Sequence, residues 1–124
     1  MVYLLVLILN PYTMSLTLRT TFGCTEAVID ADGTLKRFYQ VADLLKDLFG
    51  IEFINKEDDF DAINWDFFLV RHRLTLHYSI YNGVSIFPTR TRNARRSENN
   101  VVVELARVLE ERMLPTDSRK LPVN

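Results

Sequence analysis

Two carboxylates, Asp30 and Asp32, are the residues whose type and spacing come closest to a catalytic pair. They follow a short apolar stretch, 27–29, and precede Gly33-Thr34. Asp and Gly in this order are also typical of a polar turn, and a threonine after the turn can cap a helix by accepting a backbone N–H bond. The pair therefore has a structural interpretation, which needs no metal, beside a catalytic one.

Residues 28–35, Val-Ile-Asp-Ala-Asp-Gly-Thr-Leu, resemble the first motif of the haloacid-dehalogenase-type phosphohydrolases. The resemblance implies that Asp30 is the nucleophile, Asp32 the acid/base and Mg²⁺ the cofactor. By the same resemblance the later lysine and the acidic metal pair would be Lys56, Asp58 and Asp59. That family's parallel sheet needs several strand–helix–strand units, and this chain has room for about one. A phosphohydrolase is therefore kept as an alternative, and no cofactor is expected. An EF-hand does not fit, because the twelfth position of the loop is Val41.

Two charged stretches are the candidate partner-binding residues. The acidic one contains an aromatic residue and consists of Glu57, Asp58, Asp59, Phe60 and Asp61; the basic one contains Arg90, Arg92, Arg95 and Arg96. Each stretch is either a solvated loop or a surface that recognises a partner of opposite charge. Phe60 either folds back to anchor its loop or is presented to the partner.

The remaining nucleophilic and metal-binding residue types form no motif. His72 and His77 are the only histidines, and no cysteine or carboxylate spacing joins them into a metal cluster. Cys24 is the only cysteine, so an internal disulfide is impossible, which fits a reducing compartment and predicts a cytoplasmic protein. We expect surface histidines and a structural or idle thiol.

Composition narrows the class of protein. The chain has 124 residues, of which 48% are hydrophobic and 25% charged, as in an ordinary globular domain. The formal net charge of −1 lacks the basic excess of a dedicated nucleic-acid binder. The chain is long enough to bury a core without disulfides or metals. We expect another protein as the partner, with a homo-oligomer as a further possibility.

Residues 2–9 form an unbroken apolar run that Asn10-Pro11 ends. As a helix the run would rise about 12 Å, far short of the ~30 Å hydrocarbon core, and no Lys or Arg precedes it. Three interpretations remain open: a buried strand or helical turn, an extension upstream of Met14 that reflects the choice of start codon, and an export or membrane element. No membrane association is expected, and 1–13 is treated as an apolar extension.

The strongest element is a helix that begins after Thr34. Apolar residues at helical spacing define its buried face, and Gly50 suits the left-handed position just past its end. The apolar face contains Leu35, Phe38, Val41, Leu45 and Leu48 or Phe49. Before this helix, 15–22 alternates as a half-buried strand, with Leu16, Leu18 and Phe22 on one side.

A three-stranded antiparallel meander follows a short strand at 51–54. Trp65, Phe67 and Leu69 alternate onto one face, and a turn near Arg71-His72 is expected to pair Leu69 with Leu74. Tyr81-Asn82-Gly83 is expected to form the next loop, with Gly83 in a left-handed bulge position. That loop pairs Ile80 with Val84 and Tyr78 with Ile86, so the core face continues through Leu74, Leu76, Tyr78 and Ile80. Phe68, Val70, Tyr81 and Phe87 point the other way, where a helix covers them or they form a docking patch.

A second helix is predicted from Ser97 or Asn99, as its cap, to near Met113. Its buried face contains Val102, Leu105, Ala106, Leu109 and Met113, and 115–124 is predicted to be a flexible tail. The sequence therefore predicts a single α+β domain over 14–114, in which an antiparallel sheet packs against two helices.

The meander residues also resemble small bacterial proteins of the polymorphic-toxin immunity type. The resemblance is carried by Asp59-Phe60-Asp61, Trp65-Asp66-Phe67, residues 74–78 and residues 83–88, within a span, 59–88, of about a quarter of the chain. It implies a non-enzymatic, cytoplasmic protein that binds a toxin domain through a charged surface. We therefore expect a protein-binding domain, with a toxin-neutralising immunity protein as its specific form. The alternatives are the Mg²⁺-dependent phosphohydrolase using Asp30 and Asp32, and a structural or oligomer-forming protein.

Overall fold

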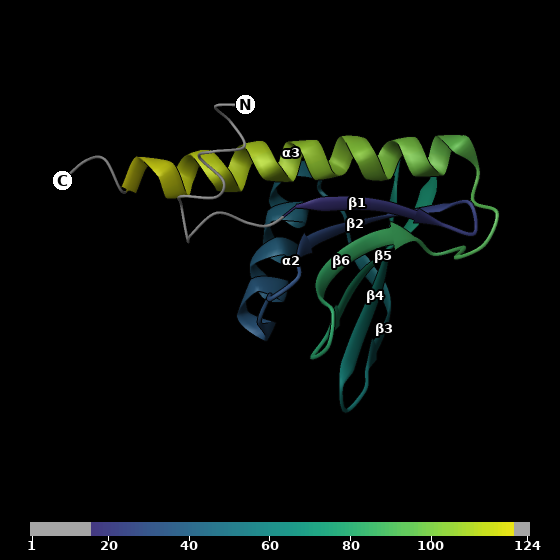
Figure 1. Cartoon of the computed structure of the whole chain (residues 1–124), viewed down its shortest axis with the longest axis horizontal. Coiled ribbons are helices and arrows are strands. Elements are labelled where there is room, and N and C mark those ends of the chain that lie inside the picture. Colours follow the sequence, from purple (N-terminus) through teal and green to yellow (C-terminus); the bar gives the residue numbers. More distant parts are fainter. Residues whose placement is uncertain (1–15, 121–124) are drawn as a thin grey trace.

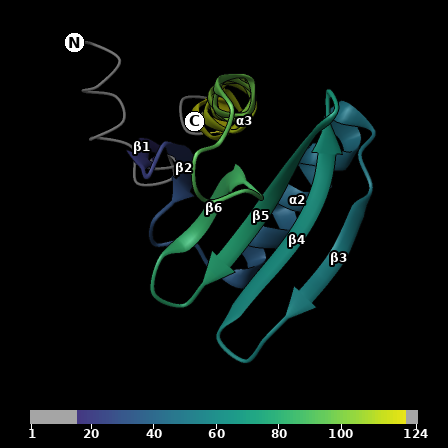
Figure 2. The ribbon, with the colours of Figure 1, turned by 90° about the vertical axis from the view of Figure 1, so that its right-hand side faces the viewer.

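The computed structural model describes residues 16–120, with side chains through Met113, and it has the predicted α+β fold. Two helices pack against a six-stranded sheet whose paired strands are all antiparallel, in the order β1-β2-β6-β5-β4-β3 (Figures 1 and 2). The elements are β1 (Thr17–Thr21), β2 (Cys24–Asp30), α2 (Leu35–Phe49), β3 (Phe53–Asp58), β4 (Ala62–Leu69), β5 (His72–Ser79), β6 (Gly83–Pro88) and α3 (Arg96–Lys120). The apolar extension 1–13 lies outside the described residues.

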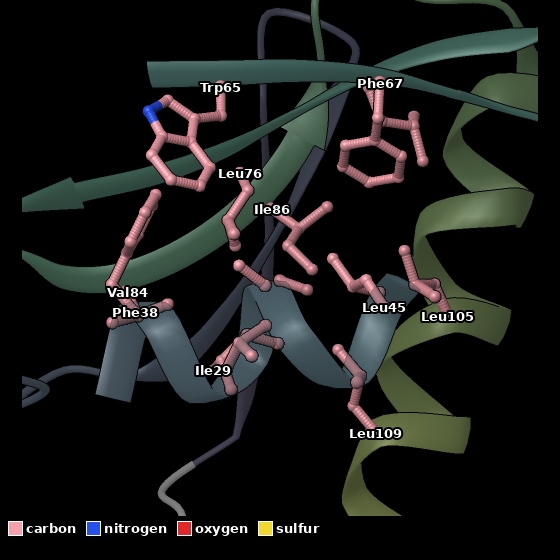
Figure 3. Packing of buried hydrophobic residues seen from close by; sticks show 14 of the residues in the cluster. Ile29, Phe38, Leu45, Trp65, Phe67, Leu76, Val84, Ile86, Leu105 and Leu109 are labelled. Carbon is pink, nitrogen blue, oxygen red and sulfur yellow. The ribbon is translucent and has the colours of Figure 1, made fainter. Parts of the chain in front are cut away.

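Both helices cover the same face of the sheet. One buried cluster joins side chains from α2 and α3 to the inward side chains of β2, β4, β5 and β6 (Figure 3). Trp65, Leu76 and Ile86 are directly paired across three strands and all lie in this cluster, as the alternation predicted. The predicted meander, β4-β5-β6, is therefore the centre of the fold, and the opposite sheet face has no helix over it in residues 16–120.

The first predicted helix is confirmed at both ends. Thr34 caps α2, and its hydroxyl accepts a bond from the Arg37 N–H at 3.3 Å. Gly50 ends the helix with φ 64°, and its N–H reaches the Lys46 carbonyl at 2.8 Å. This left-handed conformation strains any residue with a Cβ, which explains the glycine there.

The two meander hairpins have the predicted sidedness, but each is shifted by two residues from the predicted pairing. Leu69 pairs with His72 rather than Leu74, because the turn consists of Val70 and Arg71, both with positive φ (51° and 66°). A shift of two leaves the side chains that stay within the strands on their predicted faces, because strand side chains alternate with period two. Consecutive left-handed residues match the twist of a two-residue hairpin, although valine and arginine are uncommon in that conformation.

The second hairpin loop has the predicted three residues but begins one residue earlier, and both predicted pairs are wrong. Ser79 pairs with Gly83, and Tyr78 pairs with Val84 rather than Ile86. Ile80 therefore lies in the loop, 61% exposed, and does not continue the core face. Gly83 has the predicted left-handed conformation (φ 75°), and a Cβ there would collide with the Asp30 carbonyl oxygen.

The C-terminal helix differs from its prediction at both ends. It begins at Arg96, and Glu98 caps it by accepting a bond from the Arg95 N–H at 2.7 Å, so neither Ser97 nor Asn99 is the cap. Asn99 instead bonds the hairpin of β1 and β2, at Thr25 N (2.9 Å) and Gly23 O (3.0 Å). The helix continues past Met113 to Lys120.

The N-terminal strand is more exposed than its alternation predicted. β1 forms a hairpin with β2 through Phe22 and Gly23, which have φ values of 53° and 75°. All five residues of β1 are exposed, so the predicted half-burial is wrong for Leu18 and also for Phe22. The cause is the position of β1 at the edge of the sheet, away from the helices' main contacts. Within residues 16–120, neither helix combines the length and the apolar composition needed to cross a membrane.

Candidate functional site

The acidic stretch lies at the tip of the hairpin of β3 and β4. Glu57 and Asp58 end β3, and the Asp59 N–H bonds the Ala62 carbonyl at 2.8 Å, which leaves Phe60 and Asp61 as the turn. Figure 1 shows this hairpin extending away from both helices. The Phe60 side chain is fully exposed, so it does not fold back as a loop anchor. We call residues 57–61 the acidic tip.

Hydrogen bonds hold the acidic tip in one conformation. The Trp65 indole N–H donates to Asp58 Oδ1 at 2.7 Å, and the Lys56 ammonium lies 4.3 Å from the centre of the Trp65 ring. The Asp58 carboxylate therefore serves the structure of the hairpin. Glu57, Asp58, Asp59 and Asp61 are all exposed, and among them Asp58 is the one that accepts the indole N–H.

A neighbouring loop supports the acidic tip and adds apolar surface. The Ile80 N–H donates to the Asp61 carbonyl at 3.3 Å, and the Ser79 hydroxyl accepts bonds from the N–H groups of Tyr81 (3.3 Å) and Asn82 (2.9 Å). Tyr81 is 76% exposed, so no helix covers it, contrary to one of the two predictions. This end of the sheet therefore combines exposed apolar side chains with carboxylates.

Asp30 and Asp32 lie beside a pocket of about 280 Å³ at the start of α2. The Asp30 carboxylate is already engaged, because one oxygen accepts the Asp32 N–H at 3.1 Å and the other lies 3.3 Å from Arg37 Nε. This is the turn-and-cap arrangement that the structural interpretation predicted.

The other residues of the phosphohydrolase alternative lie far from this pair. Lys56 and Asp58 are on β3, four strand positions from β2, a separation of roughly 19 Å. No group of three or more His, Cys, Asp or Glu side chains among the described residues is arranged to hold a metal ion. The sheet therefore does not assemble the constellation that the motif resemblance implied.

The arginine stretch lies at the opposite end of the strands from the acidic tip. All four arginines, Arg90, Arg92, Arg95 and Arg96, are exposed on the connection from β6 to α3 and the first residue of α3. Arg92 stacks over the Phe22 ring at 4.4 Å, and the Asn93 N–H bonds the Phe22 carbonyl at 2.9 Å. The two charged stretches are therefore separate surfaces.

The face of the sheet without a helix carries a polar network. Asp66 accepts bonds from Arg73 (2.8 Å) and from the Thr75 hydroxyl (2.7 Å), and the His77 ring bonds Asn64 at 2.8 Å. Burial lowers the pKa of His77, although the nearby Glu26 acts in the opposite direction. His77 is thus half-buried rather than a plain surface residue.

Cys24 belongs to the same face. Burial raises the pKa of its thiol, with further contributions from Glu26 and then Glu98. Its sulfur donates to the Arg90 carbonyl at 3.5 Å. A thiol with a raised pKa is a poor nucleophile at neutral pH, which agrees with the predicted idle role.

An apolar groove of about 330 Å³ lies at the same end of the strands as the arginine stretch. It runs between the first half of α3, the end of α2 and the β4–β5 turn, and it is lined by Phe49, Leu69, Val70, Asn100, Val101, Glu104, Leu105 and Val108. Sequence reasoning missed this groove because its residues come from three elements. The one local signal is Val101 and Val108, which lie outside the predicted buried face of the second helix.

Phe68 and Val70 are exposed rather than covered by a helix, while Phe87 is half-buried near the His77 ring, 5.7 Å between centres.

Comparisons of the chain with protein-family models, curated proteins and solved structures gave no match.

Proposed function

We propose that this chain is a non-enzymatic protein-binding domain that docks its partner on the acidic tip. The observation that carries the proposal is the complete exposure of Phe60 at the end of a hairpin that specific hydrogen bonds hold in place. A toxin-neutralising immunity protein is the specific form of this function, in line with the resemblance of the meander residues to that class.

Exposure of a large aromatic side chain has a solvation cost that burial in a partner removes. Full burial of such a side chain contributes roughly 1.5–3 kcal/mol. Aromatic anchors surrounded by polar residues dominate the binding energy of many protein interfaces. Phe60 has this arrangement, since Asp59 and Asp61 flank it.

The conformation of the tip favours binding as well. The Trp65–Asp58 bond and the Ile80–Asp61 bond restrict the hairpin before any partner arrives. A preorganised anchor loses less conformational entropy on association than a mobile loop does. Ile80 and Tyr81, exposed beside the tip, enlarge the apolar contact area.

Charge defines the class of partner. Glu57, Asp59 and Asp61 present carboxylates around Phe60, so the partner surface is expected to be basic around an apolar socket. Such complementarity accelerates association at low salt, and the acceleration weakens as the Debye length shortens to about 8–10 Å near physiological ionic strength.

The test uses the product of the gene that adjoins this one in its host. Expression of that gene alone is expected to stop growth, and coexpression of this chain is expected to restore it. Phe60→Ala and the double variant Asp59→Lys, Asp61→Lys should each lower the binding affinity measured by titration calorimetry by about tenfold or more. Phe68→Ala is the matched control, since Phe68 is exposed on another surface.

Two outcomes would overturn the proposal. One is full rescue and unchanged affinity with both tip variants, which would move the interface elsewhere. The other is a partner whose binding surface is acidic, since carboxylates would then face carboxylates.

A further inference from the structure

The molecule carries two complementary features at opposite ends of its strands. The acidic tip lies where β4 begins, and the apolar groove lies where β4 ends, at Leu69. The tip projects one exposed aromatic side chain, and the groove is a concave surface with six apolar residues among its eight lining residues. The Phe60 side chain at the tip is packed against no other described side chain, and no described side chain fills the groove.

The rim of the groove contains a strained residue. Val70 has φ 51°, a conformation that a β-branched side chain rarely adopts, and it is 71% exposed. Asn or Gly would fit this turn with less strain. Backbone strain of this kind concentrates at sites of function, and here it places an apolar side chain at the edge of an apolar concavity.

Arginines, whose charge is opposite to that of the tip, lie around the groove, although its lining also includes one carboxylate, Glu104. Arg71 is exposed and follows Val70 in the turn, and Arg107 pairs with the lining residue Glu104 at 3.6 Å. Arg95 and Arg96 lie about one helical turn before the lining residue Asn100. An acidic segment that approaches the groove therefore meets arginines on more than one side.

We propose that the groove receives the acidic tip of a second copy of this chain, with Phe60 seated between α3 and the β4–β5 turn. A molecule cannot make this contact with itself, because the eight residues of β4 separate its tip from its groove by roughly 24 Å. In the proposed contact one copy supplies its tip and the other its groove, and no second contact is returned between the same two copies, which makes the association head-to-tail. It therefore leaves one free tip and one free groove on every pair.

Self-association has a consequence for the proposed function but does not rest on it. A tip seated in another copy's groove is not available to a partner, so the two contacts exclude each other. Partner binding would dissociate the self-associated copies. At high protein concentration, most tips would be bound in the grooves of other copies.

The first test follows the average mass by sedimentation equilibrium across a wide concentration range. The wild-type mass is expected to rise above the 14.5 kDa of one chain as concentration rises, and to fall again with added salt. Phe60→Ala should abolish the rise, and so should the groove variants Val108→Glu and Val70→Asn. Phe68→Ala should leave the rise unchanged, and circular dichroism checks that each variant is folded.

The second test mixes two variants that each fail to associate alone. Phe60→Ala keeps an intact groove and Val108→Glu keeps an intact tip, so the mixture should form a one-to-one pair and nothing larger. A contact that uses other surfaces would not show this complementation. A wild-type chain that stays monomeric at every concentration, or a mixture that does not pair, would overturn the proposal. The proposed function is judged separately, since Val108→Glu should leave partner affinity unchanged when it is measured at concentrations below those of self-association.

Discussion

The two faces of the sheet come from the same strands but are stabilised in different ways. On the inner face, Phe67 and Leu76 pack under both helices in a continuous apolar cluster. On the open face, Asp66 bonds Thr75 and Arg73, and His77 bonds Asn64. Alternate residues of one strand thus serve apolar burial and polar hydrogen bonding separately. Most polar groups of the open face have a partner, whereas Arg73 Nε and Ser85 Oγ are buried without one.

The largest expected effect lies on the inner face. Phe38 is fully buried and its ring lies 5.0 Å from Trp65 and 5.5 Å from Tyr39, so Phe38→Ala leaves a cavity where α2 meets the sheet. The free energy of unfolding should fall by about 3–5 kcal/mol. Urea denaturation measures this, and a loss below about 1 kcal/mol would mean that α2 is not the main cover of this face.

A smaller loss is expected on the open face. Asp66→Ala removes the acceptor of two hydrogen bonds and leaves the buried Thr75 hydroxyl with Thr89 as its remaining partner at 2.9 Å. The expected cost is about 1–3 kcal/mol, because the Arg73 guanidinium and the buried Thr75 hydroxyl each lose one hydrogen bond. The same urea experiment measures it, with Asp59→Ala at the exposed tip as the matched carboxylate control. Equal effects of the two variants would show that the open-face network adds nothing.

The pH dependence of stability separates the faces in another way. The pKa of His77 is lower in the folded protein than in the unfolded chain, so the unfolded chain binds the proton more readily. The stability that neutral His77 contributes is therefore fully present above the pKa of the unfolded chain, about 6.5. This stability is lost as the pH falls below that value. Urea midpoints should drop between about pH 7.5 and 5.5, and His77→Gln should reduce that drop. An unchanged drop in the variant would assign it to other groups.

The smallest effect is expected at an exposed aromatic of the open face. Phe68→Ser should change the free energy of unfolding by no more than about 0.5 kcal/mol, because Phe68 is more than half exposed and belongs to no buried cluster. Paired with Phe38→Ala, this variant compares the same residue type on the two sides of the sheet. A loss close to that of Phe38→Ala would indicate that another part of the protein covers the open face.

Alternation predicted which side the residues within the meander strands face, but it placed Ile80 wrongly on the core face, and it did not predict which residues pair. Period two fixes sidedness, so any register shifted by two satisfies the same hydrophobic pattern, and both hairpins differ from their predictions by that shift. The turn at Val70 and Arg71 could not be foreseen from turn preferences, since neither residue favours positive φ. By contrast, Gly23 directly follows the predicted strand 15–22 and is a readable hairpin signal for β1 and β2, which the prediction did not use.

Helix ends were predictable where a side chain and a glycine mark them. Thr34 and Gly50 define α2, whereas α3 uses Glu98, the third residue of its first turn, to bond the backbone of Arg95. Glu98 was readable in the sequence as an acidic residue of the first turn, but the prediction chose Ser97 or Asn99 as the cap. For the candidate site, the sequence named the acidic and arginine stretches. The sequence did not show that the two stretches lie at opposite ends of the strands, because that depends on the strand order. It also did not reveal the groove, whose lining residues come from three elements.

The bond between Trp65 and Asp58 also gives the protein its own optical label. Trp65 is the only tryptophan of the chain, it is almost completely buried, and its indole N–H ends on the acidic tip at 2.7 Å. Indole emission is sensitive to the charge and water around the ring, and here Lys56 and Asp58 are its immediate charged neighbours. Anything that docks on the tip should therefore shift the emission of the unmodified protein, so binding and self-association can be followed without attaching a dye.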